Sequence, residues 1–154
     1  REVTSRDFRC NQMVNRPGFK MNQVDPNAAV GLENLKHVDR ILGSHRSNAA
    51  FYMRELRDVP GLTLPSGPEA ADSAWWVFTV LVEDRDAFID SMNSFKIATS
   101  KVHERIDIYP ATRSSKALLP NLDWLDSRRL CLPSGWWVTE EDRQYIVDAI
   151  KEGW

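Results

Sequence analysis

Long apolar runs and a strong net charge are both missing from this sequence of 154 residues. No apolar run approaches the roughly 18–20 residues that a helix needs to span a bilayer. The net charge is −2, so the basic excess typical of proteins that bind nucleic acid or anionic membranes is also absent. The sequence therefore predicts no membrane-spanning helix within this chain, and it predicts neither a nucleic-acid partner nor a membrane partner.

Signal features and clustered cysteines are missing as well. Residues 1–7 contain neither an apolar signal core nor an initiator Met, so we expect a reading frame that begins upstream of this chain. Cys10 and Cys131 lie far apart and match no metal-binding or redox spacing. The cysteines therefore favour reduced thiols in a cytoplasmic protein. A glycine-rich phosphate loop and the HExxH, CxxC and GxSxG motifs do not occur, so the motifs predict no metal ligand and no catalytic residue.

A helical pattern is the first feature that is present. Asp25 can cap a helix, and Pro26 suits the first helical position because its missing N–H is not needed there. Apolar residues then recur at helical spacing. The pattern predicts one long helix over 26–57, with a weak point at Gly43-Ser44.

The rest of the chain predicts a small α+β layer in which helices cover a short sheet. A final helix starts at Thr139, which has capping-box spacing to Asp142. We expect its buried stripe to comprise Tyr145, Ile146, Ala149 and Ile150. The other expected elements are strands at 62–64, 75–82 and 97–102, a helix at 84–95, and a mostly irregular stretch at 107–135.

Two segments carry polar groups that could bind a ligand. Residues 101–107 combine an imidazole, a guanidinium and carboxylates just after an expected strand, where functional groups often lie. Residues 18–25 place a glycine, a cation and an amide before a helix start, which can bind anions. The alternative interpretations are a solvated charged loop for residues 101–107, which the residues by themselves favour, and a simple helix lead-in for residues 18–25.

Several segments resemble one family in the same order. Residues 18–32, GFKMNQVDPNAAVGL, resemble the segment that opens the long helix in DegT/DnrJ/EryC1/StrS-type aminotransferases. Further similar segments are PGLTLP at 60–65, IATSKVH at 97–103 and LPSGWWVTEED at 132–142. The resemblance extends over nearly the whole chain, although residues 103–107 replace a more common Pro-Leu-His stretch.

The resemblance implies a pyridoxal-phosphate enzyme of fold type I that forms a homodimer and transfers an amino group from glutamate to a nucleotide-linked keto sugar. The family's Schiff-base lysine lies upstream of the Gly-aromatic segment. None of the lysines of this chain has its sequence context, and the Asp that pairs with the pyridinium nitrogen is missing. The resemblance therefore assigns no catalytic residue here.

Individual site residues are also implied only by the resemblance. Asn22 matches a position that reaches the cofactor phosphate across the dimer, and Lys20 would help to neutralise this phosphate or a sugar diphosphate. His103 would face the substrate. Arg105, Asp107 and Tyr109 would then contact the sugar or the diphosphate.

The resulting hypothesis is a C-terminal fragment of such an aminotransferase, inactive alone. Residues 1–25 would be an irregular remnant of a missing N-terminal large domain, 26–57 the connecting helix, and 58–154 the small α+β domain. Loss of the large domain would expose Leu32 and Leu35 and promote a dimer or larger oligomer. Two alternatives stay open. One is a stand-alone ligand-binding or regulatory module, whose site would be formed by the Trp-rich surface and the His103–Asp107 loop, and the other is a fragment of a related sugar dehydratase.

Overall fold

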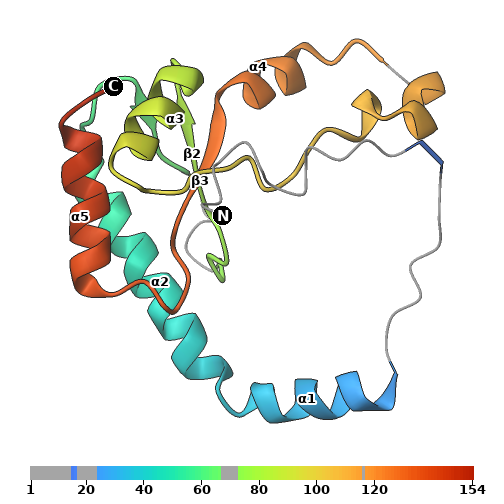
Figure 1. Ribbon diagram of the computed structural model, residues 1–154, viewed down its shortest axis with the longest axis vertical. Helices are drawn as coiled ribbons and strands as arrows, with labels where there is room; N and C mark the ends of the chain where they lie inside the picture. The colour runs from blue at the N-terminus through green and yellow to red at the C-terminus, as the bar shows by residue number, and fades with distance from the viewer. Residues whose placement is uncertain (1–14, 17–23, 67–72, 116) are drawn as a thin grey trace.

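The computed structural model describes residues 15–16, 24–66, 73–115 and 117–154. Its centre is a three-stranded antiparallel sheet in the order β1-β2-β3 (Figure 1). The strands are β1 (Leu62–Thr63), β2 (Phe78–Val82) and β3 (Arg129–Leu132). Leu62 pairs with Val82, and Phe78 pairs with Leu132. The predicted α+β class is confirmed.

The central strand β2 is buried in alternation, with Phe78, Val80 and Val82 fully enclosed. A central strand over 75–82 was predicted, and the structure confirms its position in the sheet. It begins later than predicted because Trp75 has a φ of 50°, which an extended strand does not accommodate. The Trp75 ring still joins the core, 5.4 Å from the Phe78 ring.

Helices α2 (Val38–Glu55) and α5 (Glu140–Lys151) lie side by side next to the sheet, and α3 (Arg85–Ser94) completes this layer (Figure 1). Each helix contributes apolar side chains to one core, including Tyr52, Leu56, Phe88, Met92, Val147 and Ile150. Burial of each such aliphatic or aromatic side chain contributes roughly 1.5–3 kcal/mol. The sheet and these helices are therefore stabilised together.

The predicted single helix over 26–57 is wrong. The structure has two helices, α1 (Asp25–Leu35) and α2, and the chain breaks at Lys36-His37 instead of at Gly43-Ser44. Tight i to i−3 hydrogen bonds from the N–H groups of Lys36 and His37 close the end of α1. Gly43 stays helical because its turn of α2 packs on the domain, whereas α1 has no buried residue to hold it in line.

The predicted cap at Asp25 is also wrong. Val24 is the N-cap residue of α1, and no side chain bonds to the free N–H groups there. Asp25 instead occupies the first turn, beside Pro26.

The predicted strand at 97–102 forms only a single β-bridge, between Ser100 and Cys131. The extended segment ends at Val102, where a φ of 59° turns the backbone away from the sheet. The irregular stretch predicted at 107–135 contains α4 (Pro120–Arg128) and strand β3, together with the 3-10 turns η3 (Ile106–Ile108) and η4 (Pro110–Ser115).

The last helix confirms its predicted start. Thr139 caps α5, and the reciprocal bonds with Asp142 form a complete capping box. Its buried stripe is Ile146, Val147, Ala149 and Ile150. Tyr145 was expected in that stripe but is 51% exposed, because its hydroxyl reaches outward to the carbonyl of Phe95.

Helix α1 extends away from the rest of the described chain (Figure 1). Leu32 is 68% and Leu35 is 60% exposed, which confirms the predicted exposure of these apolar side chains. Among the helices of the described ranges, none is long and apolar enough to cross a membrane.

Candidate functional site

The segment from Lys101 to Tyr109 leaves the sheet after the Ser100 bridge and leads into η3. Strand β3 fixes its beginning, since Arg129 donates a hydrogen bond to the carbonyl of His103 at 2.5 Å. We refer to residues 101–109 as the site loop. The fold thus holds the predicted ligand segment against the edge of the sheet.

A network of ion pairs underlies the site loop. Lys101 pairs with Glu104 and also with Asp126, 3.0 Å from its Oδ2. Arg129 donates to the other oxygen of Asp126 at 2.9 Å. Burial alone would raise the pKa of Asp126, but the hydrogen bonds from Lys101 and Arg129 outweigh it and hold this pKa below its ordinary value. Asp126 is therefore ionised at neutral pH and joins α4 to the loop.

The guanidinium group of Arg105 forms ion pairs with two carboxylates, those of Asp107 and Asp123. Its Nε and Nη2 donate to the two oxygens of Asp107, at 2.8 and 2.6 Å, and its Nη1 contacts Asp123. Such a bidentate pair fixes both side chains in geometry. The structure therefore brings Arg105 and Asp107 together, and their mutual contacts hold the shape of the loop. Tyr109 is half-buried, and its N–H closes η3 on the carbonyl of Ile106 at 3.4 Å.

His103 is the exposed ring of the site loop. The ring of Trp76, which precedes β2, lies 5.7 Å from it at an interplanar angle of 55°. Trp76 is 60% exposed. A Trp-rich surface beside this loop was predicted in one of the alternatives above, but the sequence did not show that Trp76 is the ring next to His103, because the two rings come from segments far apart in the chain.

The backbone immediately before His103 is strained. Val102 has a φ of 59°, and the N–H of His103 donates to the carbonyl of Lys101 at 2.7 Å. These features define a γ-turn with positive φ, which is rare, and a β-branched residue tolerates it poorly. The turn directs the His103 side chain outward from the sheet edge.

The predicted cofactor-phosphate residues Lys20 and Asn22 lie outside the described residues. Of the lysines that the structure describes, Lys101 faces two carboxylates and Lys151 contacts Glu55. Both amino groups are therefore engaged in ion pairs. Within the described ranges, no group of His, Cys, Asp and Glu side chains could hold a metal ion.

Polar side chains of α2 supply a scaffold that the sequence did not reveal. His45, Asn48 and Tyr52 are buried, and each contacts a backbone carbonyl of another segment. Tyr52 donates to Pro133 at 2.7 Å, and Asn48 donates to Gly135 at 3.1 Å. In the sequence, their spacing of three and four residues places them on one face of the helix. Polar residues on a helix face usually indicate that the face is exposed to solvent, so the spacing did not predict burial.

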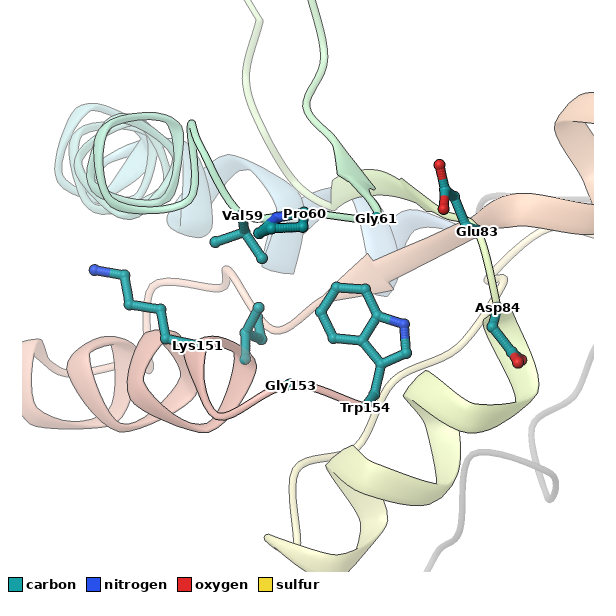
Figure 2. A pocket seen from close by; sticks show the side chains of 9 residues that line it. Val59, Pro60, Gly61, Glu83, Asp84, Lys151, Gly153 and Trp154 are labelled. Atoms are coloured by element: carbon teal, nitrogen blue, oxygen red, sulfur yellow. The ribbon is translucent and has the colours of Figure 1, made fainter.

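A cleft of about 540 Å³ lies elsewhere, around the indole of Trp154 (Figure 2). The indole packs on Gly61, whose φ is 75°, and at 4.8 Å from the Phe88 ring. Asp84, on the rim, accepts the N–H of Ala87 and caps α3. Trp154 and Asp84 in this cleft thus have structural roles, in packing and in helix capping.

A family model described as the DegT/DnrJ/EryC1/StrS aminotransferase family matches residues 3–151. Among sequence relatives, the spore coat polysaccharide biosynthesis protein SpsC of Bacillus subtilis is 25% identical over 150 residues. That alignment covers 90% of this chain and 39% of SpsC.

Solved structures are similar to this chain as well. The sugar aminotransferase CalS13 of Micromonospora echinospora superposes with a TM-score of 0.82 at 38% identity. AtS13 of Actinomadura melliaura superposes with a TM-score of 0.81 at 42% identity. Each match covers 89% of this chain but 37% of the other. The chain thus spans about two fifths of the length of the relatives it matches.

Proposed function

The chain belongs to the DegT/DnrJ/EryC1/StrS aminotransferase family, and we propose that it forms the C-terminal part of a pyridoxal-phosphate-dependent enzyme that aminates a nucleotide-linked keto sugar. The observation that carries this proposal is the likeness to the sugar aminotransferase CalS13, at 38% identity and a TM-score of 0.82. Agreement at both the sequence and the backbone level supports a shared activity better than either does alone.

Pyridoxal phosphate would supply the electron sink for amino transfer in the intact enzyme. Lys101, the lysine of the site loop, is paired with carboxylates. As the family resemblance implies, the attachment would come from a lysine upstream of this chain. Lys20 and Asn22 would contribute to the cofactor phosphate, as the family resemblance implies.

This chain's own contribution would be to bind and orient the substrate. His103 would contact it directly, being exposed at the tip of the site loop. Arg105, Asp107 and Tyr109 would approach the sugar or diphosphate. Arg105 and Asp107 would do so as a mutually paired unit that keeps the loop in one shape.

The same proposal includes the domain organisation, the oligomeric state and the cellular location of the enzyme. Residues 1–25 would belong to a large domain, α1 and α2 would connect the domains, and 58–154 would form the small domain. The exposed apolar residues of α1 support burial against further protein, in a homodimer or larger assembly. The buried free thiol of Cys131 is consistent with a cytoplasmic setting.

A glutamate-dependent amination assay tests the function. The complete enzyme that contains this chain is mixed with glutamate and a panel of nucleotide-linked keto sugars, and products are identified by mass. We expect an amino group in place of the keto oxygen, with 2-oxoglutarate formed in equal amount. Loss of a hydroxyl without nitrogen transfer would identify a dehydratase instead, and no turnover with any sugar would contradict the proposal.

A matched pair of histidine variants tests the site. His103→Ala should lower kcat/KM by roughly tenfold or more, because a substrate contact contributes on the order of 1.4 kcal/mol or more. His37→Ala changes an exposed histidine at the junction of α1 and α2 and should leave the rate unchanged. Equal rates for both variants would remove His103 from the substrate site.

A further inference from the structure

The first observation concerns backbone strain. Trp75, Lys96 and Val102 are the non-glycine residues with positive φ in the described ranges. Lys96 is explained by the end of α3, where the N–H of Ile97 donates back to the carbonyl of Met92 at 2.9 Å. Trp75 and Val102 lie at no helix end. Strained positions of this kind cluster at ligand-binding sites when the surrounding structure fixes them.

Each of these strained residues directly precedes an exposed ring. Trp76 follows Trp75, and His103 follows Val102. The two rings lie 5.7 Å apart although they come from different segments. An indole that is 60% exposed beside an exposed imidazole forms a small aromatic surface, which we call the Trp76–His103 platform.

Hydrogen bonds fix the backbone on both sides of the platform. The carbonyl of Trp75 accepts from His45 Nδ1 at 3.0 Å and from the hydroxyl of Ser134 at 3.3 Å. A carbonyl can only accept, so Nδ1 of the buried His45 is the donor in this bond. On the other side, Arg129 donates to the carbonyl of His103. The rings are thereby held in place without being covered.

The charges of the site loop and of its partners in α4 and β3 indicate which part of a ligand the platform would take. Lys101, Arg105 and Arg129 all form ion pairs, and their partners are four carboxylates: Glu104, Asp107, Asp123 and Asp126. In these three side chains a phosphate group would meet cations that are already paired with carboxylates. A planar, uncharged heterocycle suits the exposed rings, because bases stack on Trp and His side chains.

We propose that the Trp76–His103 platform stacks the base of the nucleotide-linked substrate. The choice of a nucleotide rests on the proposed function, whereas the platform itself rests on the two exposed rings and the strained, hydrogen-bonded backbone that presents them. Trp76 is thus a substrate-binding residue, and His45 and Ser134 are positioning residues for it.

Calorimetric titration of the 154-residue chain tests this. The probes are UDP, dTDP and GDP, with inorganic pyrophosphate as the base-free control. We expect at least one nucleotide to bind and pyrophosphate not to bind. Trp76→Ala should weaken binding by about 5- to 150-fold, as expected for loss of one base stack. Trp76→Phe should keep most of the affinity.

The matched control is Trp136→Ala, since Trp136 is 48% exposed but packs on Arg40 and Trp137 instead of His103. It should bind nucleotides like the wild type. Unchanged affinity in Trp76→Ala, equal binding of pyrophosphate, or no nucleotide binding by the folded wild-type chain would each overturn the platform. None of these results bears on amino transfer, which the amination assay decides separately.

Discussion

Asp126 is the residue on which the site loop depends most. It accepts from Lys101 and Arg129, and so links α4, β3 and the loop. Its pKa is lower in the folded chain than in the unfolded chain. Its contribution to stability is therefore present above the unfolded pKa of about 3.9 and is lost as the pH falls through the folded pKa.

Replacing this carboxylate tests that linkage. Asp126→Asn should lower the free energy of unfolding by about 1 kcal/mol at neutral pH, since partly exposed ion pairs contribute up to about 1 kcal/mol. The deficit should shrink as the pH falls below 4, because the wild type then loses the same charge. Urea denaturation across this pH range measures it. Asp58→Asn, at an exposed carboxylate, serves as control. A deficit that does not depend on pH would contradict the ion-pair account.

Tyr52 tests the buried scaffold of α2. Its side chain is fully enclosed, and its hydroxyl donates to Pro133 at 2.7 Å. Burial raises the pKa of this hydroxyl, so it stays protonated as a donor. Tyr52→Phe should cost about 1–2 kcal/mol, because the Pro133 carbonyl is left without this donor. Tyr145→Phe removes an exposed hydroxyl and should cost less than about 0.5 kcal/mol. Urea denaturation measures both variants. An equal loss of unfolding free energy in the two variants would contradict a stabilising role for the buried Tyr52 hydroxyl.

At the scale of elements, α5 provides the clearest test. Thr139 accepts the N–H of Asp142, while Asp142 accepts the N–H of Thr139 at 2.9 Å. Thr139→Ala should lower the free energy of unfolding by about 1 kcal/mol. Thr139→Ser keeps the hydroxyl oxygen and should retain most of the wild-type stability. Thermal denaturation by circular dichroism measures both variants. If Ser and Ala were equally destabilising, the capping bond would not be the cause.

The contrast between α5 and β3 explains what the sequence could predict. The capping box is local, so Thr139 and Asp142 identified the start of α5 correctly. Strand β3 was missed because its four residues are recognisable as a strand only through pairing with β2, far away in the chain. The same limit applies to the site: the sequence offered a Trp-rich surface beside the His103–Asp107 loop, but it could not show that Trp76 is the tryptophan next to His103.

The break between α1 and α2 has a different origin. Periodicity continues through Lys36-His37, and no proline or glycine marks the break. The break lies within an exposed stretch, since α1 has no buried residue and the first buried residue of α2 is His45. Among the described residues, no packing contact holds the two helices in line there, and the sequence pattern does not show where such contacts begin.

At the scale of the whole molecule, the exposed face of α1 predicts association. Leu32→Ser with Leu35→Ser should shift the chain toward monomer, because each exposed leucine would gain about 1.5–3 kcal/mol from full burial in a partner. Light scattering over a range of concentrations measures the mass. Leu118→Ser is the matched control, since Leu118 is 97% exposed in another part of the chain. A wild type that stays monomeric at high concentration would contradict the prediction.

The central claim is that this chain helps to form a pyridoxal-phosphate site without carrying the lysine that holds the cofactor. The most direct measurement is borohydride reduction of the complete enzyme, followed by mass spectrometric identification of the labelled peptide. The account predicts a single labelled lysine outside these 154 residues. Stoichiometric labelling of Lys20, Lys36, Lys96, Lys101, Lys116 or Lys151 would contradict it.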